Sequence, residues 1–209
     1  MDLITKEYLS VVSVIMALVS YVPYIRGMIK GTTRPHAFSW FIWAILTFIA
    51  FFAQITQGGG VGSWLMGITA VITLGISLAA FFVGKRDIKR GDWYCFTLSL
   101  LAIPLWAVTK DPSFSVILIT VIDAIAFYPT FRKGYHKPYE EVIFTYVIGG
   151  LKFFVGIMAL EAYNLNTVLY PASLVIMNGA FVALLVWRRR NMAQSDRVQA
   201  ADTTPATSQ

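Results

Sequence analysis

Long runs of apolar residues, separated by short polar turns that contain glycine or proline, fill most of the chain between residues 8 and 187. Each run holds roughly 17 to 25 residues, the length that an α-helix needs to cross the hydrocarbon core of a bilayer. A helix also satisfies its own backbone hydrogen bonds where water is absent. The pattern therefore predicts seven transmembrane helices, at residues 8–29, 37–56, 62–84, 93–109, 113–131, 140–161 and 166–187.

The composition favours a membrane protein over a soluble one. Of the 209 residues, 57% are hydrophobic and only 13% are charged, which leaves too little polar surface to cover a soluble domain of this size. Residues 191–209 differ, because they are rich in Ala, Ser, Thr, Gln and Asp and lack a hydrophobic period. We expect this segment to be a disordered cytoplasmic tail. The single cysteine, Cys95, is expected to be a small apolar side chain in a helix.

The basic residues are distributed unevenly between the two sides of the predicted helices. Fourteen of the 17 Lys and Arg residues follow the first, third, fifth and seventh helices, whereas only Lys6 and Lys110 lie on the other side and Lys152 lies within a helix. Loops rich in Lys and Arg remain in the cytoplasm. The sequence therefore predicts a multi-pass protein of the cell (inner) membrane, with its N-terminus outside and its C-terminus in the cytoplasm.

Two parts of the chain share a pattern at the end of a predicted helix. Pro23 precedes Arg26 by three residues at the end of the first helix, and Pro129 precedes Arg132 by three residues at the end of the fifth. A short basic loop follows in both places. Transporters are often built from duplicated units, and the interface between such units contains the substrate site.

The similarity continues into the next helix of each part. Pro35 and Pro138 open the second and sixth predicted helices, and the eighth residue after each proline is aromatic, Trp43 and Tyr146 respectively. Three helices reverse the direction of the chain, so a second unit of the same orientation requires one additional crossing. The predicted organisation is a first triple-helix unit at 1–92, a linker helix at 93–112, a second triple-helix unit at 113–190 and the tail at 191–209.

This layout resembles the PQ-loop superfamily, which includes the SWEET (MtN3) sugar transporters, vitamin-precursor transporters of the nicotinamide riboside type and the KDEL receptors. The resemblance covers nearly all of the chain up to residue 190 and rests on the 3+1+3 order, the two prolines and the basic loops that follow them. The dipeptide that names the superfamily is absent, since Tyr24 follows Pro23 and Thr130 follows Pro129. A closer similarity, which implies no function, is to small bacterial membrane proteins at residues 35–40, 127–133 and 137–141.

The resemblance implies an all-α integral membrane fold of seven helices, in which two parallel triple-helix bundles are joined by a linker helix. It also implies that Pro23 and Pro129 act as hinges during alternating access. The residues alone leave a second interpretation open, because a proline near the end of a helix can simply terminate it.

Two ionisable residues, Asp123 and Lys152, lie inside predicted helices. A charge in the membrane core costs at least a few kcal/mol, so it usually faces a cavity or a partner. At about 1.5 Å per residue, Asp123 lies about 15 Å from the outer end of its helix and Lys152 about 18 Å from the inner end of its own. We expect the two to face each other near the midplane, with Asn178 at a similar depth. They either bind a polar substrate or exchange a proton, or they form a fixed structural ion pair.

Aromatic residues complete the predicted substrate site. Trp43 lies one turn deeper than Trp40 and can reach a central cavity, as can Tyr146 in the second unit, whereas Trp40 is expected to anchor its helix at the membrane interface. The predicted substrate-binding residues are Asp123, Lys152, Asn178, Trp43 and Tyr146. The sequence offers no set of nucleophile, base and acid at a common depth, so we expect no enzyme, no cofactor and no metal site.

The leading functional hypothesis is a transporter of a small polar solute, such as a sugar, a vitamin-like compound or a zwitterionic metabolite. It would work by alternating access around a midplane site. The alternative is a membrane receptor or sensor of the same fold that binds its ligand without moving it. The expected partners are the lipid bilayer and the small-molecule substrate, and a homo-oligomer is compatible with the sequence. No nucleic acid is expected, because the net positive charge is explained by the cytoplasmic loops.

Overall fold

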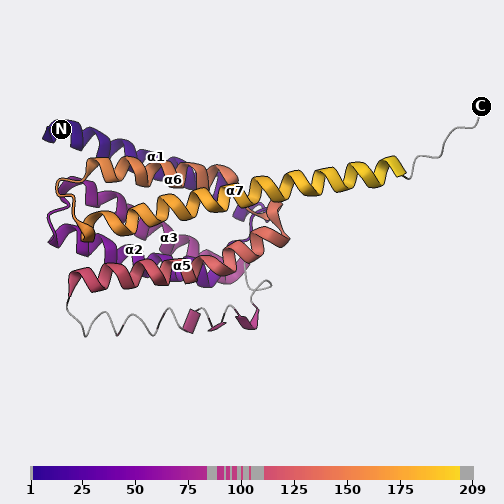
Figure 1. Cartoon of the computed structure of the whole chain (residues 1–209), viewed down its shortest axis with the longest axis horizontal. Helices are drawn as coiled ribbons and strands as arrows, with labels where there is room; N and C mark the ends of the chain where they lie inside the picture. Colours follow the sequence, from indigo (N-terminus) through magenta and orange to yellow (C-terminus); the bar gives the residue numbers. More distant parts are fainter. Residues whose placement is uncertain are drawn as a thin grey trace, which may run out of the picture.

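A computed structural model of the protein describes residues 2–83, 89–91, 93, 94, 96, 97, 100, 104 and 111–202. In these parts the chain forms helices and connecting turns, and no β-strand (Figure 1). The elements are α1 (Leu3–Ile29), α2 (Ala37–Thr56), η1 (Gly60–Ser63), α3 (Trp64–Val83), α5 (Pro112–His136), η3 (Pro138–Glu140), α6 (Ile143–Ala159) and α7 (Leu165–Asp202). Most of the predicted linker helix at 93–109, including Cys95, lies outside the described residues.

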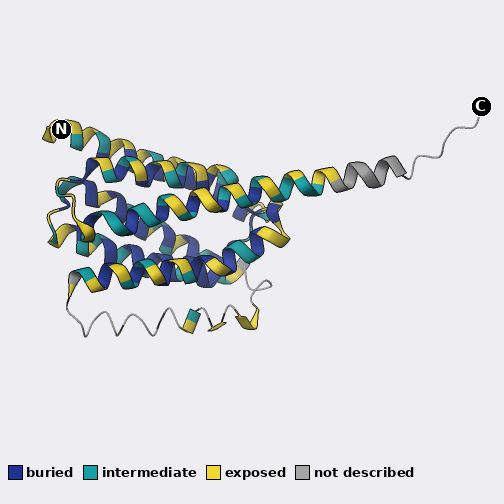
Figure 2. Ribbon diagram, viewed as in Figure 1, coloured by how far each residue is buried: buried dark blue, intermediate teal, exposed yellow. Residues whose placement is uncertain are grey.

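Five helices, α1, α2, α3, α5 and α7, are long and apolar enough to cross a membrane, and α6 is shorter but also apolar. The distribution of side chains on α1 is the reverse of that in a soluble protein. Ser13 and Ser20 are buried within the bundle, whereas Ile15 and Leu18 are exposed. Figure 2 shows buried residues gathered toward the interior of the bundle and exposed residues on the outer faces of its helices. An apolar exterior around a partly polar interior suits a hydrocarbon environment and not water. The described chain is therefore an all-helical protein with the features of membrane insertion.

In each set of three successive helices, the third helix packs between the first two. The helix α3 packs against both α1 and α2, and α7 packs against both α5 and α6. Contacts of α1 with α6 and of α2 with α5 join the two sets into a ring. Figure 1 shows that α1, α3, α5 and α7 run in one direction and that α2 and α6 run in the other. Because α7 packs between them, α5 and α6 are separated in space although they are adjacent in the sequence.

The turns between helices lie at two ends of the bundle. One end holds residues 30–36 and 137–142 and is called the basic end, because Arg and Lys side chains surround it. The other holds residues 57–59 and 160–164 and is called the opposite end. At the opposite end the side chain of Asp111 caps α5 by accepting hydrogen bonds from the backbone N–H groups of Ser113 (2.8 Å) and Phe114 (3.4 Å). This cap satisfies N–H groups that have no partner within the helix.

The proline residues do not terminate their helices, so that interpretation is wrong. The helix α1 continues past Pro23 to Ile29, and α5 continues past Pro129 to His136, beyond the predicted end at residue 131. An internal proline removes one backbone hydrogen bond, and the flanking turns can remain helical when tertiary packing supports them. Whether Pro23 and Pro129 act as hinges stays a prediction.

The predicted disorder of the tail at 191–209 is wrong for its first part. The helix α7 runs without a break from Leu165 to Asp202, and Figure 1 shows its C-terminal part projecting from the bundle. This segment contains Met, Ala, Gln and Arg, which are favourable in helices, and extending an existing helix requires no new nucleation. The low hydrophobicity of this segment does not prevent helix formation.

Candidate functional site

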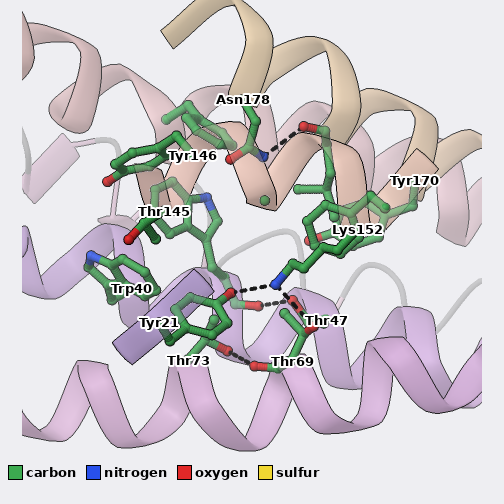
Figure 3. Close-up of a pocket in the computed structure, with 15 residues that line it drawn as sticks. Tyr21, Trp40, Thr47, Thr69, Thr73, Thr145, Tyr146, Lys152, Tyr170 and Asn178 are labelled. Carbon is green, nitrogen blue, oxygen red and sulfur yellow. Dashed lines mark hydrogen bonds between the residues drawn. The ribbon is translucent and has the colours of Figure 1, made fainter. Parts of the chain in front are cut away.

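A cavity lies inside the ring of helices, and all six of α1, α2, α3, α5, α6 and α7 contribute side chains to it (Figure 3). Its volume is about 50 Å³. The cavity is therefore narrow. Its wall combines aromatic rings with hydroxyl groups, one amide and one amine, which is a typical composition for a small-molecule site.

Lys152 is the cationic side chain among the described residues of the cavity wall, and it is only 1% exposed. Its Nζ donates hydrogen bonds to the hydroxyl of Tyr21 on α1 (2.9 Å) and to Oγ1 of Thr69 on α3 (3.4 Å). Nζ also lies 4.3 Å from the centre of the Tyr21 ring and 4.7 Å from that of Phe153. Figure 3 shows the amine directed toward Tyr21 and Thr69, across the cavity from α6.

Asp123 is completely buried on α5, but it does not line the cavity. Its Oδ1 accepts a hydrogen bond from the hydroxyl of Tyr170 on α7 (3.3 Å). Its Oδ2 has no hydrogen-bond partner within the described part of the chain. Because Tyr170 does line the cavity, Asp123 lies one side chain behind the wall.

The prediction that Asp123 and Lys152 face each other is wrong, and so is the fixed ion pair between them. None of the ion pairs between described residues joins the two, since each involves Lys133 or Lys137. The cause is the helix order. Because α7 lies between α5 and α6, the side chain that meets Asp123 comes from α7, and Lys152 reaches α1 and α3 instead.

The structure places the other three predicted residues, Trp43, Tyr146 and Asn178, in the cavity wall. The Trp43 ring lies 4.5 Å from the ring of Phe127, and its Nε1 is buried without a hydrogen-bond partner among the described residues. The Nδ2 of Asn178 donates to the carbonyl oxygen of Leu174 (2.7 Å), within its own helix. Four of the five predicted residues therefore share one cavity, and their role in binding stays a prediction.

Trp40 is not an interfacial anchor, contrary to the prediction. It is 3% exposed, lines the cavity and donates a hydrogen bond from Nε1 to the hydroxyl of Tyr24 (3.2 Å). Its position near the start of α2 is correct, but α2 begins within the bundle and not at its surface. A tryptophan near a helix end therefore turns inward here, because buried side chains of neighbouring helices provide a partner for its N–H group.

Sequence reasoning missed the uncharged polar side chains of the wall. Tyr21 and Tyr170 provide the hydroxyls next to Lys152 and Asp123, and Thr69 and Thr73 line the cavity from α3. Neutral Thr and Tyr residues are common in apolar helices, so each one alone carries little information. The spacing of Thr69 and Thr73 was the available signal, because residues four apart lie on the same face of a helix.

A second buried polar group, here called the Glu141 cluster, joins three helices at the basic end. It consists of Glu141, Lys133, Tyr24 and Tyr146. The Oε1 of Glu141 accepts from Nζ of Lys133 at 2.7 Å, and its Oε2 accepts from the hydroxyls of Tyr146 (3.0 Å) and Tyr24 (3.3 Å). Lys133 also donates to the backbone carbonyl of Arg34. Tyr146 belongs both to this cluster and to the cavity wall, so the two sites adjoin.

The roles of Lys133 and Glu141 were not recognised in the sequence. The predicted helices at 113–131 and 140–161 leave Lys133 in a cytoplasmic loop and place Glu141 at the start of a helix. The longer α5 carries Lys133 into the bundle, where it is 4% exposed, and α6 begins only at Ile143. Glu141 therefore precedes the helix in extended backbone and turns inward, where it is 3% exposed.

The chemistry of the site is suited to binding a solute through hydrogen bonds and ring contacts. In the described part of the chain, no group of three or more His, Cys, Asp or Glu side chains could hold a metal ion. Comparisons of the chain with known protein families, with characterised proteins and with solved structures found no match.

Proposed function

We propose that this chain is a membrane transporter for a small polar solute, and that the solute binds in the central cavity. The observation that carries the proposal is the placement of Lys152, a buried amine on the cavity wall with hydroxyl partners and no carboxylate partner among the described residues. A charged group inside a membrane protein is costly and usually marks a substrate or ion pathway. A purely structural core would be more stable with an apolar side chain here.

Contacts at both ends of the bundle support alternating access. At the basic end, the Glu141 cluster connects α1, α5 and α6 next to the cavity. At the opposite end, Nε2 of Gln54 on α2 donates to the carbonyl of Thr167 on α7 (2.9 Å). Gly62 of η1 also lies so close to Leu160 that a Cβ atom there would be 2.7 Å from its backbone nitrogen. A solute can leave the cavity only if the contacts at one end separate while those at the other end remain.

The packing of the helices supports two units of the same design. In each set of three, the last helix lies between the first two, and α3 and α7 have the same direction. We infer a 3+1+3 organisation in which residues 93–109 form the linker helix. Rocking of the two units about their interface, with bending near Pro23 and Pro129, would open the two ends in turn.

Counterflow in proteoliposomes tests the proposal. Purified protein is reconstituted in vesicles loaded with one unlabelled solute, and entry of the same labelled solute is followed for glucose, nicotinamide riboside, glycine and lactate. We expect time-dependent accumulation of at least one solute, which vesicles without protein do not show. The Lys152→Met variant, reconstituted at the same level and with an unchanged elution profile, should lose this accumulation.

A receptor or sensor with the same fold is the second candidate. The narrow cavity, with contacts across both ends, suits retention of a ligand as well as its passage. Binding of a solute to the purified protein, with no counterflow of that solute in sealed vesicles, would favour this alternative over transport.

A further inference from the structure

Lys152 and Lys133 are both buried, but only Lys133 has a carboxylate partner among the described residues. Lys133 is paired with Glu141 at 2.7 Å. Among the described residues, Lys152 has two hydroxyl oxygens as hydrogen-bond partners and lies over the rings of Tyr21 and Phe153, all of which are uncharged. An ammonium group has three N–H donors, and the two hydrogen bonds of Nζ leave one of them for a further acceptor. A buried cation with neutral partners has lost its hydration without gaining a counterion, which is an unfavourable state.

The protein's own buried carboxylates cannot supply this charge in the observed arrangement. Asp123 is bound to Tyr170 and lies behind the cavity wall, and Glu141 is held by Lys133 and two tyrosine hydroxyls. Neither is close enough to form an ion pair with Lys152. Among the described residues, the wall of the cavity therefore carries a positive group and no negative one.

One further polar group of the wall, the indole N–H of Trp43, also suits a ligand that accepts hydrogen bonds. The Nε1 of Trp43 is a donor with no acceptor function, and it has no partner in the described part of the chain. Aromatic rings surround these donors: Trp40 and Trp43 lie 5.2 Å apart at their centres, and Phe127 contacts Trp43. The wall thus offers one cation, a free N–H donor and flat apolar surfaces.

We propose that the ligand of this cavity is a small carboxylate with a flat or apolar body, whose carboxylate group pairs with Lys152. This proposal rests on the proposed function, because it names the class of solute that binds in the same cavity. One cation matches the single charge of a carboxylate, and entry of that group supplies the missing counterion and acceptor. The body of the ligand lies against the aromatic rings, and the narrow space restricts it to a small compound.

The test compares compounds of equal shape and different charge. Phenylacetate, phenylacetamide and phenethylamine, and separately lactate and lactamide, are added to the purified protein in detergent, and binding is measured by titration calorimetry. We expect phenylacetate or lactate to bind about ten- to a hundredfold more tightly than its amide, which is the usual range for a hydrogen bond to a charged group. Phenethylamine should not bind measurably.

Two variants test whether the preference for a carboxylate over its amide arises in the cavity. Lys152→Met should abolish the difference between the carboxylate and its amide, while thermal unfolding and the elution profile show that the variant is folded. Lys30→Met removes a positive charge from an exposed position at the basic end, and it should leave the difference unchanged. If Lys152→Met does not fold, Lys152→Arg keeps the charge and should retain the preference for the carboxylate.

Several outcomes would overturn the inference. It is wrong if no carboxylate of the panel binds, if the amides bind equally well, or if the amine binds more tightly. Because calorimetry requires no flux, the two proposals fail separately. Carboxylate binding without counterflow would contradict transport alone, whereas counterflow of glucose without carboxylate binding would contradict the ligand class alone.

Discussion

A tyrosine hydroxyl forms a hydrogen bond with each of the two charged-type residues deep in the bundle, Lys152 and Asp123. Tyr21 accepts from Lys152, and Tyr170 donates to Asp123, so the same type of side chain serves a cation in one place and a carboxyl group in the other. A phenol can do both because it is a donor and an acceptor. These contacts replace part of the lost hydration, but a hydroxyl does not neutralise a charge. The two residues therefore remain sensitive to any ligand or proton that enters.

The hydrogen bond between Asp123 and Tyr170 leads to a prediction about stability. Asp123→Asn keeps an oxygen that can accept from the Tyr170 hydroxyl and removes a buried carboxyl group that lacks a cationic partner in the described chain. We expect its midpoint of thermal unfolding in detergent to equal or exceed that of the unchanged protein. Asp123→Leu leaves the Tyr170 hydroxyl buried without its acceptor, which should cost about 1–3 kcal/mol.

The double variant Asp123→Leu with Tyr170→Phe provides the control. Because it removes both partners, it should recover much of the stability that Asp123→Leu loses. Equal losses for Asp123→Asn and Asp123→Leu would contradict the prediction and would mean that the negative charge itself is required. Counterflow by Asp123→Asn then shows separately whether the carboxyl group takes part in function.

At this scale the sequence identified the important side chains better than their partners. Asp123 and Lys152 were recognisable because charges are rare in apolar helices, and counting residues along each helix placed both deep in the bundle. Depth, however, does not determine which neighbouring helix a side chain meets. That depends on the packing order, and nothing in the local sequence of Asp123 indicates that Tyr170, 47 positions later, lies beside it.

The ends of helices have a different chemistry from their centres. The Glu141 cluster joins the last turn of α5, the segment before α6 and the C-terminal part of α1. Arg189 of α7 extends this network, because its guanidinium donates to the backbone carbonyls of Pro138 and Glu141. Elements from four helices therefore meet beneath the cavity, and their separation is the step that would open the basic end.

The ion pair of this cluster should contribute strongly to stability. Lys133→Met leaves Glu141 buried without its cation, a change that typically costs about 3–5 kcal/mol. Lys137→Met is the matched control, since Lys137 is four positions away, its side chain is 43% exposed and it lies 4.0 Å from Glu140. An exposed pair of this kind contributes at most about 1 kcal/mol. Thermal unfolding of both variants in the same detergent measures the difference.

Adding Glu141→Gln to Lys133→Met tests the physical cause. The amide retains acceptor oxygens for Tyr24 and Tyr146 but carries no charge, so the double variant should be more stable than Lys133→Met alone. Two results would contradict this explanation: a loss no larger than that of Lys137→Met, or no recovery in the double variant. Either would mean that the pair is not the main connection between these helices.

The helices themselves were largely predictable, and their ends were not. The range 37–56 agrees with α2, because an apolar run bounded by turn residues defines both ends. Past residue 131 the hydrophobic pattern stops, yet α5 continues to His136 because its polar last turn packs into the Glu141 cluster. Tertiary contacts of this kind extend a helix where hydrophobicity alone would end it.

On the scale of the whole molecule, the two ends of the bundle differ sharply in charge. Among the described residues, Lys6 is the basic side chain near the opposite end, where it donates to the carbonyl of Glu161 (3.2 Å). The basic end includes Arg26, Lys30, Arg34 and the three consecutive arginines at 188–190. Because the helices place these residues together, the asymmetry seen along the sequence becomes a difference between two surfaces.

This asymmetry predicts the orientation of the protein in a cell membrane. Short loops rich in Lys and Arg remain in the cytoplasm, so the basic end should face inward and the opposite end outward. Two exposed positions report on the two ends: Thr56, at the end of α2, and His136, at the end of α5. Each is replaced by cysteine in a background in which Cys95 is changed to serine, and intact cells are treated with a membrane-impermeant maleimide.

We expect Thr56→Cys to be labelled in intact cells and His136→Cys to be labelled only after the membrane is permeabilised. The Cys95→Ser background without a new cysteine gives the level of non-specific labelling. The reverse pattern would contradict the predicted orientation. Labelling of both positions in intact cells would contradict the prediction that the basic end faces the cytoplasm. If the protein transports a solute as proposed, the same result would identify the Glu141 cluster as the inner or the outer closure of the cavity.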